Sequence, residues 1–111
     1  MLSFQRLDVY QRAIDLLALT NEIVALLPKG NADRGDQLVR SAESILRNIA
    51  EGAGRWTKRD GAKHYMIARG EAMEVAASLD VLKVGRIVSE EHYSRGVALL
   101  ERIVAMLTKL A

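Results

Sequence analysis

The stretch from Gln37 to Arg55 constrains the fold more than any other, because its apolar residues recur at the spacing of an α-helix. One row of them follows at intervals of three and four residues: Leu38, Ala42, Ile45, Ile49 and Gly52. Residues at this spacing share one face of a helix, so the stretch predicts an amphipathic helix with a buried stripe. Gly52 and Gly54 are expected to end it, one of them in the left-handed conformation that glycine tolerates best.

Similar spacing elsewhere predicts helices over residues 5–27, 36–52, 58–85 and 90–110. The chain is rich in alanine and leucine and has a single proline, Pro28, which favours helix over sheet. Pro28 to Gly35 is interpreted as a loop, and Thr57 and Ser89 are suitable N-caps for the last two helices. Short loops between four helices predict an all-α fold, an antiparallel up-down four-helix bundle that forms one domain over residues 1–111.

A second apolar row accompanies the first on the helices predicted at residues 5–27, 58–85 and 90–110. In the third helix the first row, expected to face the core, consists of Tyr65, Ala68, Ala72, Val75, Leu79 and Leu82, and the second row consists of Met66, Met73, Ala77, Val81 and Val84. A helix of a monomeric bundle needs only one apolar stripe, and a large apolar surface left in water usually marks an interface. The double rows therefore predict a homo-oligomer. The alternative is one wide stripe, padded with alanine, that the chain buries by itself.

The sequence offers little for catalysis or metal binding. It contains no cysteine and only two histidines, His64 and His92. Neither has a glutamate three residues before it, so the Glu-x-x-His signature of di-iron bundles is missing. The histidines are interpreted as surface or helix-end residues, and no nucleophile has a base arranged beside it. We therefore expect no enzyme activity, no metal site and no cofactor.

Charge and hydropathy bear on location and partners. No apolar run approaches the roughly 20 residues of a membrane span, and the first residues lack the pattern of a signal peptide. We therefore expect a cytoplasmic protein with no membrane partner. The formal net charge of +2 is too small to dictate a polyanionic partner. However, Lys and Arg outnumber Asp and Glu between Asp33 and Arg69.

Polar residues form a line on the helix predicted at residues 36–52: Arg40, Ser44, Arg47, Asn48 and Glu51. Asn48 and Glu51 lie beside the apolar stripe, so part of this line is expected to be buried. A buried charge needs a partner, and Arg69 or Arg40 would suit Glu51. One interpretation is a structural polar network of Asn48, Glu51 and Arg69 that fixes the second helix against the third. The other is a binding site for a ligand or partner.

The segment between the second and third helices is basic and carries the only tryptophan, Trp56. Around it lie Arg55, Lys58, Arg59 and Lys63. Cations bind phosphates and an aromatic ring stacks on bases, so this segment predicts a phosphate-binding patch with one stacking side chain. The alternative is a solvated loop with a half-buried tryptophan.

Residues 40–55, RSAESILRNIAEGAGR, closely resemble the second-helix signature of the bacterial 23S rRNA intervening-sequence proteins, which are four-helix-bundle proteins. Leu7–Ala13 is similar to the family's first-helix opening, and Tyr65–Gly70 with Glu74 is similar to its third-helix segment. The resemblance covers nearly the whole chain. Glu71 departs from it, because the family commonly has serine at that position.

The resemblance implies a bundle that assembles as a ring, typically a homopentamer, and a link to nucleic acid. A related accessory variability protein of diversity-generating retroelements has the same bundle and binds nucleic acid and a reverse transcriptase. The cations carried over as phosphate contacts are Arg40, Arg47, Arg55, Lys58, Arg59 and Lys63. The leading hypothesis is a non-catalytic homo-oligomer that binds RNA, or else DNA, through this basic surface. The alternative is an assembly or adaptor protein that docks a protein partner through an apolar helix face.

Overall fold

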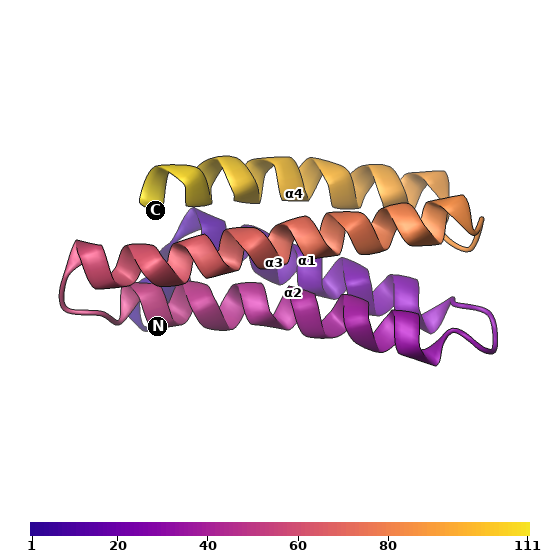
Figure 1. Cartoon of the computed structure of the whole chain (residues 1–111), viewed down its shortest axis with the longest axis horizontal. Coiled ribbons are helices and arrows are strands. Elements are labelled where there is room, and N and C mark those ends of the chain that lie inside the picture. Colours follow the sequence, from indigo (N-terminus) through magenta and orange to yellow (C-terminus); the bar gives the residue numbers. More distant parts are fainter.

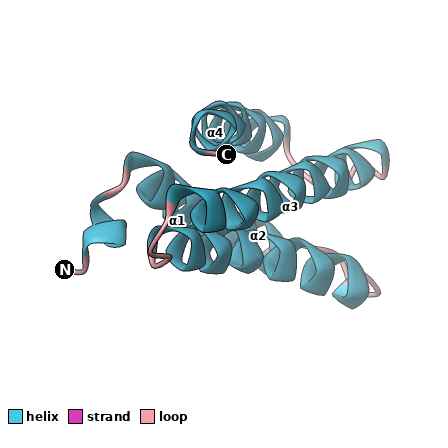
Figure 2. Cartoon of the chain, turned by 60° about the vertical axis from the view of Figure 1, so that its left-hand side comes forward, coloured by secondary structure: helices cyan, strands magenta, loops and turns pink.

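Four long helices run alternately up and down in a computed structural model that describes residues 1–111 (Figure 1). A short 3₁₀ helix, η1 (Ser3–Arg6), precedes α1 (Asp8–Ala25), α2 (Ala32–Ala53), α3 (Lys58–Val84) and α4 (Glu90–Leu110). Each helix packs against its neighbours in sequence, and α4 closes the bundle against α1. Figure 2 shows α4 lying away from α2. The predicted all-α, antiparallel four-helix bundle is confirmed.

The core is built from the apolar stripes that the spacing predicts. Leu38, Ala42, Ile45 and Ile49 of α2 are fully buried. They meet the stripe of α3, which consists of Ala68, Ala72, Val75, Leu79 and Leu82. Residues of α1 and α4 complete one continuous core of 18 buried apolar side chains. Sequence periodicity thus identified the inner faces of α2 and α3 correctly.

The first helix is shorter than the predicted 5–27. Leu7 is extended, with φ −65° and ψ 134°, and it separates η1 from α1. The Gln5 side chain accepts a hydrogen bond from the Leu2 N–H at 2.8 Å, and the Gln11 amide donates to the Gln5 carbonyl at 2.8 Å. These local bonds favour a tight turn over a longer helix. At the other end, Pro28 disfavours the helical conformation at the residue before it, and α1 ends at Ala25.

The second helix begins at Ala32, earlier than the predicted residue 36, so the predicted loop is confirmed for Pro28 to Asn31 and wrong for residues 32–35. Gly35 lies within α2 and is buried. A Cβ atom on Gly35 would lie 3.2 Å from Val24 Cγ1 and 3.3 Å from Leu27 Cδ1. This glycine therefore serves close packing against the end of α1, and it does not mark a turn.

The expected left-handed glycine at the end of α2 is also absent. Gly54 has φ −82°, and the positive φ angles belong to Gly30 and Arg86. Gly52 lies where α2 crosses α3, and a Cβ atom there would be 2.8 Å from Tyr65 Cε1. A Cβ atom on Gly61 of α3 would be 2.6 Å from the Gly52 carbonyl oxygen. The two glycines let the helices touch backbone to backbone.

The predicted N-caps are confirmed, because Thr57 accepts a hydrogen bond from the Asp60 N–H at 3.1 Å and Ser89 accepts one from the His92 N–H at 3.0 Å. The C-terminus of α3 is closed by the left-handed residue Arg86, with φ 58°. The N–H groups of Arg86 and Ile87 bond to carbonyls of the last turn of α3 at 3.0 Å. This is a Schellman motif with arginine where glycine is usual.

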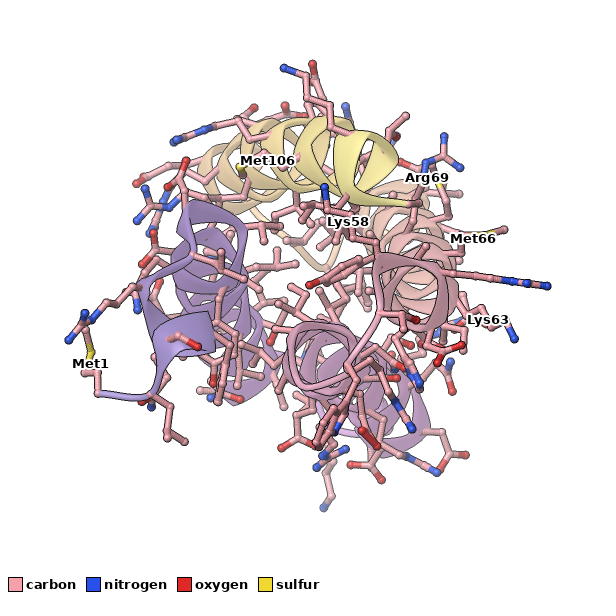
Figure 3. All side chains as sticks on the ribbon, turned by 90° about the vertical axis from the view of Figure 1, so that its left-hand side faces the viewer. Met1, Lys58, Lys63, Met66, Arg69 and Met106 are labelled. Atoms are coloured by element: carbon pink, nitrogen blue, oxygen red, sulfur yellow. The ribbon has the colours of Figure 1, made fainter.

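The second apolar row of α3 remains in water. The exposed fractions are 63% for Met66, 45% for Met73, 50% for Val81 and 85% for Val84. Figure 3 shows Met66 pointing outward from α3, beside Lys63 and Arg69. The corresponding rows of α1 and α4 are mostly half-buried against their neighbours. The uncovered apolar surface is therefore concentrated on the outer face of α3. None of the helices combines the length and hydropathy that a bilayer span requires.

Candidate nucleic-acid interface

The α2–α3 loop lies at the same end of the bundle as both termini (Figure 1). A hollow with a volume of about 400 Å³ opens there. It is lined by Gly52, Ala53, Arg55, Trp56, Thr57, Lys58, Gly61, Tyr65, Lys109 and Leu110. Three of the predicted site residues, Arg55, Trp56 and Lys58, thus meet in one concave surface. The lining contains cations and aromatic rings but no carboxylate.

Trp56 is fully exposed, at 101% of its reference surface. The structure therefore does not support the alternative of a half-buried tryptophan. A tryptophan offers roughly 150–250 Å² of surface for burial, and here the chain covers none of it. Packing within the chain therefore does not explain why a tryptophan stands at this position. Its large flat side chain is free to stack on a ligand.

The cations at this end are mostly unpaired. Arg55 lies 3.6 Å from Glu51, but both side chains are about half exposed and water screens such a pair. The remaining predicted cations form no ion pair within the chain: Lys58, Arg59 and Lys63. Figure 3 shows Lys58 over the end of the bundle and Lys63 on the outer face of α3. The N-terminus of α3 adds its partial positive charge to the same region.

Arg40 and Arg47 lie on α2, away from the hollow. They precede Arg55 by about 22 Å and about 12 Å along the helix axis, at 1.5 Å per residue. Both are exposed, and Arg47 lies 3.6 Å from Glu43. These two arginines therefore lie on the exposed surface of α2, and they do not line the hollow.

The structure does not bring Asn48, Glu51 and Arg69 into one network. Asn48 Nδ2 donates to the carbonyl and hydroxyl oxygens of Ser44 at 2.9 and 3.2 Å, within α2. Glu51 is exposed and pairs with Arg55, as described above. Arg69 lies on the α4 side of α3, where its Nε donates to Thr108 Oγ1 at 2.9 Å. Each residue makes a separate contact because the three point in different directions.

Two residues of the hollow were missed by the sequence analysis. Lys109 is 51 positions from Lys58, yet up-down topology brings the end of α4 to the start of α3. That topology was the only signal that could have found it. Tyr65 was interpreted as a core residue, but its ring forms part of the lining. Burial raises the pKa of its hydroxyl, which therefore stays protonated at neutral pH and can donate a hydrogen bond.

Other ionisable groups do not form a second site. No three His, Cys, Asp or Glu side chains are placed to hold a metal ion. His92 lies in the first turn of α4, 3.5 Å from Glu22, as a helix-end residue should. His64 is half-buried, and its Nδ1 has no hydrogen-bond partner. Glu71 lies beside Glu74, and burial followed by this neighbour raises the pKa of Glu71.

The fold and this surface define a small four-helix-bundle protein with a basic, tryptophan-bearing end. The chain belongs to the 23S rRNA-intervening sequence protein family, whose model matches residues 5–109. The predicted family is therefore confirmed.

The fold is similar to that of a solved structure, a protein of unknown function from the S23 ribosomal protein family of Bacteroides thetaiotaomicron. The TM-score is 0.84, and the match covers 92% of this chain and 96% of that one at 21% sequence identity. At this identity the likeness shows the fold alone. No curated protein matches the chain.

Proposed function

We propose that this chain is a non-catalytic, homo-oligomeric protein that binds RNA through the α2–α3 end of the bundle. The observation that carries the proposal is the fully exposed Trp56 between the cations Arg55 and Lys58. Proteins that bind single-stranded nucleic acid combine a positively charged groove with aromatic rings on which bases stack. The description of the family, which refers to 23S rRNA, favours RNA over DNA.

The homo-oligomer is supported by the outer face of α3. Its exposed apolar row gains from being covered, because apolar surface removed from water contributes about 25 cal/mol per Å². Assembly would repeat the basic end once per chain, so that weak sites add up on one RNA. The family resemblance implies a ring, so we expect five copies of the chain in the oligomer.

The test is light scattering coupled to size-exclusion chromatography of the untagged protein, with absorbance read at 260 and 280 nm. We expect a multiple of the 12.3 kDa chain mass and an excess of 260 nm absorbance that high salt removes. The reversal Arg55→Glu/Lys58→Glu/Arg59→Glu should abolish RNA binding. Lys29→Glu/Arg34→Glu/Arg86→Glu changes the charge equally at the opposite end and should leave most of the binding. Equal loss in both variants would refute the proposed interface.

A second candidate function is docking of a protein partner. It is favoured by a groove between α3 and α4 with a volume of about 430 Å³. The groove is lined almost entirely by apolar residues, which include Met73, Ala76, Val97 and Val104. Such a complex would withstand salt, because apolar contacts are not screened. An oligomer that purifies free of nucleic acid and captures a protein at high salt would support this function over RNA binding.

A further inference from the structure

The hollow at the α2–α3 end is large enough for a small ligand. Its volume of about 400 Å³ lies near the lower limit of ligand pockets, which run from about 300 to 1,000 Å³. Cations stand on two sides of it, because Lys58 comes from the start of α3 and Lys109 from the last turn of α4. Neither lysine forms an ion pair within the chain. A phosphate between them would meet no carboxylate in the lining.

The floor of the hollow is fixed by the two glycines. Because Gly52 and Gly61 have no Cβ atom, the backbones of α2 and α3 come into contact there, and no room is left for a side chain at either position. The Tyr65 ring packs directly against Gly52 and forms part of the lining, and burial raises the pKa of its hydroxyl, so the hydroxyl is protonated at neutral pH. A hydroxyl that donates hydrogen bonds suits a phosphate oxygen or a base carbonyl. The hollow is thus formed before any ligand arrives.

Trp56 determines whether the hollow can bind single-stranded or double-stranded nucleic acid. An indole ring can stack on a base only if one face of that base is free, and within a duplex both faces of every internal base are stacked on neighbouring pairs. We infer that the hollow holds one unpaired nucleotide of a single-stranded RNA, with its base on Trp56 and a phosphate between Lys58 and Lys109. This inference rests on the proposed function and narrows it to single-stranded segments or ends.

Trp56 also reports on the site directly, because it is the only tryptophan of the chain. A 12-nucleotide single-stranded RNA, a blunt duplex of the same sequence and free uridine 5′-monophosphate are titrated into the full-length protein. We expect the single strand to quench Trp56 fluorescence and the duplex to bind without quenching. The mononucleotide should leave the fluorescence unchanged at concentrations where the strand saturates. Equal quenching by the mononucleotide would identify a free nucleotide as the ligand and would overturn the inference.

Variants separate the hollow from general electrostatic binding. Trp56→Ala should weaken single-strand affinity by about 10-fold or more, whereas Trp56→Phe, which keeps a stacking ring, should retain most of it. Lys58→Gln/Lys109→Gln should reduce the slope of log K against log salt by about 0.7, the value for the one phosphate held between the two lysines. Lys29→Gln/Arg34→Gln at the opposite end is the matched control. Trp56 is fully exposed, so its removal should leave the melting temperature unchanged.

The outcomes distinguish the two proposals. If the protein binds single strands and duplexes equally, without quenching and without loss in Trp56→Ala, the hollow is refuted while RNA binding stands. If neither RNA binds at low salt, the proposed function fails and the hollow fails with it. Quenching by the single strand, lost in the lysine double variant and kept in the control, supports both.

Discussion

Gly52 and Gly61 face one another where α2 meets α3, and neither position tolerates a side chain. The carbonyl of Gly52 would lie 2.6 Å from a Cβ atom on Gly61, well inside van der Waals contact. A Cβ atom on Gly52 would lie 2.8 Å from Tyr65 Cε1 and 3.0 Å from the Gly61 carbonyl oxygen, and backbone atoms cannot rotate out of the way as a flexible side chain does. The close separation of α2 and α3 at the basic end therefore requires that both residues have only a hydrogen atom in place of a side chain.

Gly61→Ala should lower the free energy of unfolding by about 1–3 kcal/mol, because overpacking forces the two helices apart. Urea unfolding followed by circular dichroism measures the change. Gly70→Ala is the control on the same helix, since a Cβ atom there meets nothing within 4 Å. It removes the low helix propensity of glycine and should not destabilise the chain. Similar destabilisation by both substitutions would contradict the packing explanation.

Glu71 provides a pH-dependent prediction. Burial and then the neighbouring Glu74 raise the pKa of Glu71 above its usual 4.5, so its charged form is disfavoured in the folded chain. The folded state is therefore favoured below pH 4.5, and that contribution is lost as pH rises through the raised pKa. Glu71→Gln should stabilise the chain at pH 7 by up to about 0.5 kcal/mol, a typical size for a like-charge pair on a helix.

The advantage of Glu71→Gln should disappear near pH 4, where the wild-type carboxyl is already protonated. Thermal melts at both pH values test this. Glu101→Gln, on the exposed side of α4, is the control and should show no such difference. A stabilisation at pH 4 as large as that at pH 7 would show that removal of charge is not its cause.

The helix α3 is apolar on two faces, and only one of them is buried by its own chain. The inner stripe joins the core, while Met66 and Met73 project from the outer face over two turns. Gly70 lies between the two methionines, in open space. This face is flat at its centre and apolar on both sides, which suits close approach of a second copy of the chain.

Met66→Glu/Met73→Glu should reduce the oligomer to the 12.3 kDa chain mass, because each interface would have to bury unpaired carboxylates. Light scattering measures the mass, and circular dichroism should show unchanged helix content because both residues are exposed. Ile14→Glu/Leu26→Glu places the same charges on exposed apolar positions of α1 and its C-cap. If this control dissociates the oligomer and the α3 variant does not, the contact lies on α1.

The inner faces of the helices could be predicted because helical periodicity is a local property of the sequence. Glycine roles could not, because Gly35 and Gly52 look like turn residues until the neighbouring helix is in place. Similarly, the basic loop around Trp56 was evident in the sequence, but Lys109 required the topology. The partners of Asn48, Glu51 and Arg69 depend on how each helix is rotated about its axis. Periodicity fixes that rotation only to within the width of a stripe.

At the scale of the whole molecule, the apolar surface and the basic surface occupy separate regions. The apolar outer face of α3 and the basic hollow at the α2–α3 end share one helix but use different parts of it. If α3 joins the copies, assembly leaves the hollows available and repeats them with the symmetry of the oligomer. An RNA long enough to reach several hollows would then gain from effective concentration, whereas a short one would not.

This arrangement predicts a difference between long and short RNA. Met66→Glu/Met73→Glu should weaken binding of a long, unstructured single strand by about 100-fold or more, since linked sites gain about 10²–10⁴ over single ones. Binding of a six-nucleotide strand, chosen as a ligand for a single hollow, should change little per chain. Fluorescence anisotropy of both labelled RNAs gives the two affinities, and Ile14→Glu/Leu26→Glu again controls for the added negative charge. If the short strand loses as much affinity as the long one, then the outer face of α3 contacts RNA itself, and assembly and binding are not separate functions of this helix.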